Sequence, residues 1–195
     1  MGINVQNKLS HWNYYLALEQ DLIKVSRYIE FDEANFNTYS LELAHLLLAA
    51  SSEVDVVAKI LCKLLDETND YRNINDYRQK IKDGCPEVSD RVVYSDRYAL
   101  QLTPWINWQG TENPDWWRCY NNVKHQRDEN YSEANLKNVL NALAALKVLI
   151  VYMYKAQFER EKGTQMEIRD VTYELVPKPS LFSFSQDDYY QELMV

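Results

Sequence analysis

Arg118 and His125 stand near the two ends of a short polar run, residues 116–127, that carries three Lys or Arg residues and no acid. In a helix, positions i, i+3, i+4 and i+7 share one face. This spacing would group four side chains: Arg118, Asn121, Asn122 and His125. An arginine binds phosphate oxygens with paired hydrogen bonds, a histidine can transfer a proton near neutral pH, and amides can orient the group between them. The run therefore predicts a site that binds or reacts with a phosphate.

The composition is that of an acidic protein of single-domain size. The chain has 195 residues, a mass of 23.1 kDa and a formal net charge of -8. A chain of this length can bury most of its apolar surface in one domain. The net charge argues against a protein that coats nucleic acid through bulk electrostatics, because phosphate neutralisation requires clustered cations. A local basic site is still allowed.

Cysteine and histidine usage indicates neither a disulfide framework nor a metal site. The three cysteines are odd in number and show no C-x-x-C spacing, which is typical of a reducing compartment. The histidines lie far apart and lack the paired spacing of zinc ligands. With four glycines there is no glycine-rich phosphate loop, and the N-terminus lacks the layout of a signal peptide. We therefore expect a cytoplasmic protein with no metal, no cofactor and no membrane partner.

Long segments without helix breakers predict helices. Neither glycine nor proline occurs within residues 3–83 or 115–162. A first helix is expected from about residue 11 to 31, behind Ser10 as its N-cap. A second helix is expected from about residue 38 to 67, with apolar residues at alternating steps of four and three. These are Leu43, Leu47, Ala50, Val54, Val57, Leu61 and Leu64. This stripe should form the spine of the core.

The second half of the chain should contain the helix with the polar run and one more long helix. A short helix is expected at 74–83, and a new helix should begin at Pro114 and include residues 116–127. Ser132 can cap the last long helix. Its apolar face comprises Leu136, Val139, Leu140, Leu143, Leu146, Leu149, Ile150 and Met153. Its run from Ala142 to Tyr154 contains a single charge, Lys147, and is too short for a membrane span, so we expect a buried core or dimer helix.

Two segments lose the helical period and are expected to be extended or irregular, one near 88–110 and one near 166–176. The second, with Ile168, Val171, Tyr173 and Leu175, suggests an edge strand, and residues 177–195 resemble a tail. The expected organisation is one helical domain over 1–160 with a C-terminal extension over 161–195 that packs on the bundle or trails from it.

The tryptophans near the motif and the two other histidines are expected to have structural roles. Clustered tryptophans can stack nucleobases, but they more often fill a core or a dimer interface, which is the interpretation we favour. They are Trp105, Trp108, Trp116 and Trp117. We also expect His11 to be exposed and His45 to lie in the core or at its boundary.

The polar run resembles the motif of the HEPN (higher eukaryotes and prokaryotes nucleotide-binding) superfamily. In this family an arginine is followed, after four to six residues, by a histidine near the start of a late helix. Arg118 and His125 match the six-residue version. Tyr120-Asn121 and Lys124-His125 are similar to the Tyr-Asn and Lys-His pairs of many prokaryotic members.

The preceding helix adds to the resemblance. Residues 40–65 place Glu53, Asp55 and Lys59 within an apolar helix, which is similar to the acid-then-lysine helix that packs next to the family motif. The resemblance implies an all-α, HEPN-like helical bundle with two long core helices. Glu53 and Asp55 would support the basic face, although an Asp55–Lys59 surface ion pair explains their spacing equally simply.

The resemblance implies a metal-independent endoribonuclease that cleaves RNA through attack of a 2′-hydroxyl on the adjacent phosphodiester. His125 would be the general base or an orienting group, and Arg118 would stabilise the transition state. Substrate-binding or supporting roles would fall to Tyr120, Asn121, Asn122, Lys124 and Arg127. In the family two motifs face each other across a two-fold axis, which implies a homodimer. A toxin or phage-defence role, with an antitoxin or regulatory protein as partner, is compatible with this activity.

A non-catalytic alternative stands beside this hypothesis. The same face could belong to a helical interaction or nucleotide-binding module, or be an ordinary solvated surface. Cys119 favours this alternative, because the family often has Asn, Asp or His directly after the arginine. The acidic net charge favours it as well.

Overall fold

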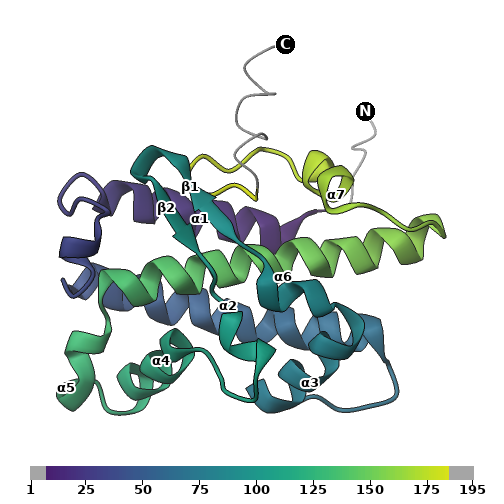
Figure 1. Cartoon of the computed structure of the whole chain (residues 1–195), viewed down its shortest axis with the longest axis horizontal. Coiled ribbons are helices and arrows are strands. Elements are labelled where there is room, and N and C mark those ends of the chain that lie inside the picture. The colour runs from purple at the N-terminus through teal and green to yellow at the C-terminus, as the bar shows by residue number, and fades with distance from the viewer. Residues whose placement is uncertain (1–7, 185–195) are drawn as a thin grey trace, which may run out of the picture.

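The computed structural model describes residues 8–184 and folds them into a mainly α-helical bundle (Figure 1). The α-helices are α1 (Ser10–Val25), α2 (Leu41–Leu65), α3 (Ile74–Gly84), α4 (Asp115–His125), α5 (Arg127–Asn130), α6 (Leu136–Lys162) and α7 (Ile168–Glu174). Between α3 and α4, strands β1 (Val93–Ser95) and β2 (Leu100–Leu102) pair antiparallel. A mainly α-helical fold with short extended segments near 88–110 is thereby confirmed.

The long helices α2 and α6 form the centre of the bundle, side by side and in the same direction (Figure 1). Near their starts, the Leu136 N–H donates to the carbonyl of Thr38 at 2.9 Å. Beside their ends, Arg160 forms an ion pair with Glu67. Both connections fix the relative position of the two helices along their axes.

Helix α2 follows the predicted stripe. The hydroxyl of Ser40 accepts the N–H of Leu43 at 3.1 Å, which satisfies one of the free donors at the helix start. The stripe residues from Leu43 to Leu61 are fully buried, and Leu64 is partly buried. Each large apolar side chain buried here contributes about 1.5–3 kcal/mol relative to exposure. The predicted spine of the core is therefore correct.

Helix α6 is buried on nearly all sides rather than along one face. Its length and hydropathy would suffice for a membrane span, but 83% of its most apolar window is buried inside the protein, as in a core helix. Its N-cap is Asn135, whose side chain accepts the N–H of Asn138; the predicted cap, Ser132, lies in a preceding 3₁₀ turn. Gly163 ends the helix in the left-handed conformation, with φ of 69°.

The C-terminal extension packs against α6. Two predictions about this extension are wrong. Residues 168–174 form helix α7, not a strand, because Ile168, Val171 and Leu175 face the bundle at helical spacing while Tyr173 is 79% exposed. Residues 177–184 are not a trailing tail: Phe182 is buried, and Ser183 pairs with Tyr94 of β1 through two backbone hydrogen bonds. Residues 185–195 lie outside the described part of the chain.

The first helix is shorter than predicted. It ends at Val25, and the chain then turns through residues 26–40 before α2. Ser10 is its first helical residue and makes no side-chain cap.

Candidate functional site

The predicted polar face lies on α4, and its orientation follows from what the helix buries. Trp116, Trp117, Tyr120 and Val123 are buried against the bundle. Arg118 and His125 stand on the opposite side and are exposed, flanked by the half-buried Asn121 and Asn122. One face of one helix thus brings together the four side chains that the sequence grouped.

An aromatic ladder attaches α4 to the rest of the protein. The rings of Trp105, Trp108, Trp116 and Trp117 are in successive contact at centroid distances of 4.1–5.7 Å, and all four are buried. The indole N–H of Trp116 donates to the carbonyl of Pro104 at 2.8 Å, and that of Trp105 to the carbonyl of Ala145 on α6. The core interpretation is confirmed. These rings are not available to stack nucleobases.

Arg118 has a partner that is easily displaced. Its Nη2 donates to Asp115 Oδ1 at 3.0 Å, and both side chains are 71% exposed. An exposed pair at this i,i+3 spacing contributes only about 0.3–0.5 kcal/mol. A phosphate with two oxygens for the guanidinium fork can therefore replace the carboxylate at little cost.

Asn121 and Asn122 direct their amide donors into the fold. Asn121 Nδ2 donates to the carbonyl of Trp117, and Asn122 Nδ2 donates to Glu133 Oε2, both at 2.9 Å. Each amide nitrogen carries a second N–H, so these bonds leave one donor on each side chain that can serve a phosphate. The Asn121 bond lies within α4, whereas the Asn122 bond ties α4 to the turn before α6.

Cys119 lies in the same interface. Burial raises the pKa of its thiol to about 11, and the nearby Glu133 carboxylate adds to the increase. The thiol is therefore protonated at neutral pH, which makes it a packing group between α4 and α6 rather than a nucleophile.

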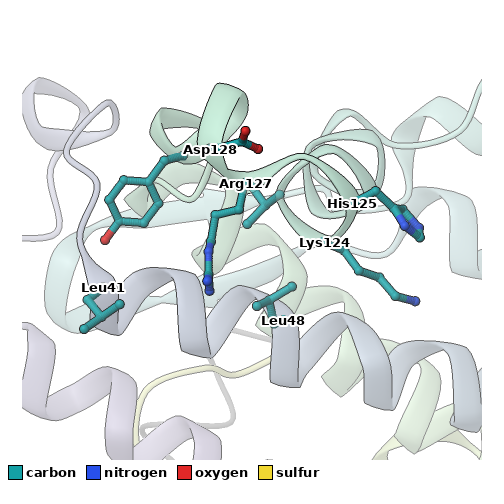
Figure 2. A pocket seen from close by; sticks show the side chains of 8 residues that line it. Leu41, Leu48, Lys124, His125, Arg127 and Asp128 are labelled. Atoms are coloured by element: carbon teal, nitrogen blue, oxygen red, sulfur yellow. The ribbon is translucent and has the colours of Figure 1, made fainter.

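Next to this face, a groove of about 850 Å³ separates the end of α4 and the start of α5 from α2 (Figure 2). Its lining residues are Leu41, Leu48, Val123, Lys124, His125, Arg127, Asp128 and Tyr131. Three predicted site residues, Lys124, His125 and Arg127, are thus brought together here. Tyr120 lies beneath Lys124, with the ammonium 5.4 Å from its ring centroid. Arg118 and the two asparagines lie outside the lining, on the adjoining face of α4.

Sequence reasoning missed the apolar wall of this groove. Leu41 and Leu48 are seven residues apart on α2 and lie outside the stripe that faces the core. Leu41 is 61% exposed. An apolar residue on the otherwise polar face of an amphipathic helix was the available signal.

The acidic residues of α2 do not support the basic face of α4. Oε1 of Glu53 lies 2.6 Å from Nδ1 of His11, so His11 is half-buried and paired, contrary to the expectation that it is exposed. Asp55 accepts a hydrogen bond from the Tyr77 hydroxyl. It also lies 3.7 Å from Lys59, so a surface ion pair explains the spacing of Asp55 and Lys59. His45 is exposed, so its predicted place in the core or at its boundary is wrong.

Comparison with known proteins gives no match to a family model, to a curated protein or to a solved structure. Within residues 8–184, no three His, Cys, Asp or Glu side chains are grouped as metal ligands. The motif, α4 and its groove are therefore the features from which a function can be inferred.

Proposed function

We propose that this chain is a metal-independent endoribonuclease of the HEPN type, acting on RNA in the cytoplasm. The observation that carries the proposal is the joint exposure of Arg118 and His125 on one face of α4, beside a groove with two further cations, Lys124 and Arg127. On a protein with a net charge of -8, such a local cluster suits a polyanionic substrate. The parallel core helices α2 and α6 would be the two long helices of the HEPN-like bundle.

The proposed reaction is an internal transesterification. The 2′-oxygen of one nucleotide forms a bond to the adjacent phosphorus, and the bond from phosphorus to the 5′-oxygen of the next nucleotide breaks. His125 accepts the proton of the 2′-hydroxyl, while Arg118 binds the phosphoryl oxygens as negative charge develops on them. The departing 5′-oxygen takes a proton from a second acid. The products are a 2′,3′-cyclic phosphate and a 5′-hydroxyl end.

The reaction needs a second acid, and this need supports a homodimer. Among the described residues that line the groove, His125 is the one histidine. A second copy related by a two-fold axis would place another His125 opposite the first, and one histidine would accept a proton while the other supplies one. The tryptophans and α6 give no support for this dimer, because they are buried within one chain. Val56 of α2, which is exposed and outside the groove lining, is an apolar residue that a second copy can cover.

A non-catalytic interaction or nucleotide-binding module is the second candidate. Two observations favour it: Arg118 already has a weak partner in Asp115, and within residues 8–184 no side chain hydrogen-bonds to the His125 ring to orient it. A general base is usually held by such a group. Under the nuclease proposal the partner copy or the substrate supplies this contact. A toxin or phage-defence role, with an antitoxin or regulatory partner, would be the biological setting.

Cleavage by the purified protein should persist in EDTA and stop when the scissile nucleotide lacks its 2′-hydroxyl. The reason is that the nucleophile belongs to the substrate and the charge is balanced by Arg118. Labelled single-stranded RNA and the same strand with one 2′-deoxy position, separated on denaturing gels, provide the measurement. Equal cutting of the 2′-deoxy strand, or a strict requirement for Mg²⁺, would rule out this mechanism.

Mixed dimers that carry one His125→Ala copy should lose far more than half of the wild-type activity, because both histidines would serve one reaction. Tandem-linked dimers fix the composition, and a linked dimer with one Arg72→Ala copy is the control. A loss of one half would indicate independent sites. Light scattering that reports only monomers for an active enzyme would contradict the shared site.

A further inference from the structure

Tyr131 lines the groove at the end where Leu41 begins the α2 wall. Its ring meets that of Tyr39 edge-on, with centroids 5.3 Å apart and planes at 80°. Tyr39 precedes Leu41 by two residues and is 50% exposed. Tyr131 itself is half-buried, so one end of the groove presents a partly exposed aromatic pair next to an exposed leucine.

This pair is held in place by backbone contacts. Tyr39 forms an isolated antiparallel bridge with Asn135. The N–H of Leu136 donates to the carbonyl of Thr38, and the N–H of Lys137 to the carbonyl of Phe36. The Tyr39 backbone is thus fastened to the start of α6. A ring on such a support loses little conformational freedom when a ligand stacks on it.

The cations follow one another along the groove from this aromatic end. Figure 2 shows Arg127 reaching toward α2 between Leu41 and Leu48, with Lys124 and His125 beyond Leu48. Asp128, the one acid of the lining, projects away from α2 in the same view. The groove lining thus has an aromatic end followed by Arg127 and then Lys124. Its volume of about 850 Å³ falls in the range typical of ligand sites, about 300–1,000 Å³.

We propose that Tyr131, backed by Tyr39, is a stacking platform for one unpaired nucleobase of a single-stranded RNA. The phosphates that follow this base would contact Arg127 and Lys124 and lead the strand to His125. A base can lie flat on an aromatic ring only when it is unpaired, so the site selects single strands over duplex. This inference rests on the proposed function and specifies the substrate of the same site.

The test uses a fluorescein-labelled, fully 2′-O-methylated RNA oligonucleotide, which can bind but has no free 2′-hydroxyl to attack. Fluorescence anisotropy on the full-length protein should show binding that Tyr131→Leu weakens by about tenfold or more, as expected for the loss of one stacked base. Tyr131→Phe keeps the ring and should bind as the wild type does. Tyr28→Leu removes a tyrosine that is 87% exposed and outside the groove, and should also have no effect.

Salt dependence separates the aromatic contact from the ionic ones. Arg127→Gln and Lys124→Gln should each reduce the slope of log affinity against log salt by about 0.7, whereas Tyr131→Leu should lower the affinity without changing the slope. An oligonucleotide with an abasic site at the stacked position should bind wild type and Tyr131→Leu equally. A melting curve for each variant verifies that it is folded.

The outcomes distinguish this inference from the nuclease proposal. No binding by the wild type, equal binding by Tyr131→Leu, or equal affinity for duplex RNA would each overturn the stacking platform. Binding that depends on Tyr131, together with no cleavage of unmodified RNA, would support the platform and reject the nuclease.

Discussion

Replacement of His125 by alanine is expected to reduce RNA cleavage by at least about a hundredfold, the usual loss when a positioned acid or base is removed. Replacement of Arg118 by alanine should cost about as much, because it removes the group that balances the transition-state charge. Initial rates with labelled RNA give both values. Since the two side chains would work as one catalytic unit, the double variant should be little worse than either single one.

Exposed residues of the same types provide the controls. Arg72 is 79% exposed and paired with Asp70, much as Arg118 is paired with Asp115, so Arg72→Ala should leave cleavage unchanged. His45→Ala is the matched histidine control, because His45 is exposed and outside the groove lining. Both catalytic variants should keep the far-UV circular dichroism and the Tm of the wild type. Wild-type cleavage by either one would remove the basis of the proposed mechanism.

Local sequence periodicity was sufficient to predict the elements that carry the site. The α2 stripe and the exposed face of α4 both follow from the helical repeat, because the buried side of an amphipathic helix also determines its exposed side. Arg118 and His125 could therefore be placed on solvent from sequence alone. The tryptophans were expected in a core or a dimer interface because clustered tryptophans usually fill such places, and they lie in the core.

The groove could not be predicted, because its walls come from segments far apart in the sequence. Leu41 and Leu48 face Lys124 and Arg127 only because α2 and α4 both pack on α6. The aromatic platform has the same origin, since Tyr39 meets Tyr131 through the backbone bridge to the start of α6. Helical repeats carry no information about such pairings.

The C-terminal extension was misjudged for a related reason. Residues 177–184 contain two prolines and little periodicity, which is typical of a tail. Their position is decided by distant partners instead: Trp12 donates its indole N–H to the carbonyl of Pro177 at 2.9 Å, and the buried Lys147 donates to the carbonyl of Phe182. A lysine in the middle of a core helix was the visible signal, because a buried ammonium requires acceptors.

Glu19→Ala is expected to destabilise the protein by about 3 kcal/mol or more, because several buried donors would lose a charged acceptor. The Glu19 side chain is fully buried on α1. Its carboxylate accepts the backbone N–H of Ser180 at 2.8 Å, that of Phe182 at 3.3 Å, and the hydroxyl of Tyr15 at 2.9 Å. Urea denaturation followed by circular dichroism measures the loss of stability, and hydrogen exchange measures the opening of the two amides.

Two variants on the same helix make this prediction specific. Glu19→Gln retains one carbonyl acceptor and should lose less stability than Glu19→Ala. Asp21→Ala removes an acid that is 45% exposed and paired with Lys24 on the surface, and should change stability by no more than about 0.5 kcal/mol. Rapid exchange of the Ser180 and Phe182 amides in the wild type would contradict the buried contact.

Glu19 and residues 177–184 lie on the opposite side of the bundle from α4 (Figure 1). RNA cleavage per folded molecule should therefore be retained in Glu19→Ala, which separates this role in stability from the proposed chemistry of Arg118 and His125.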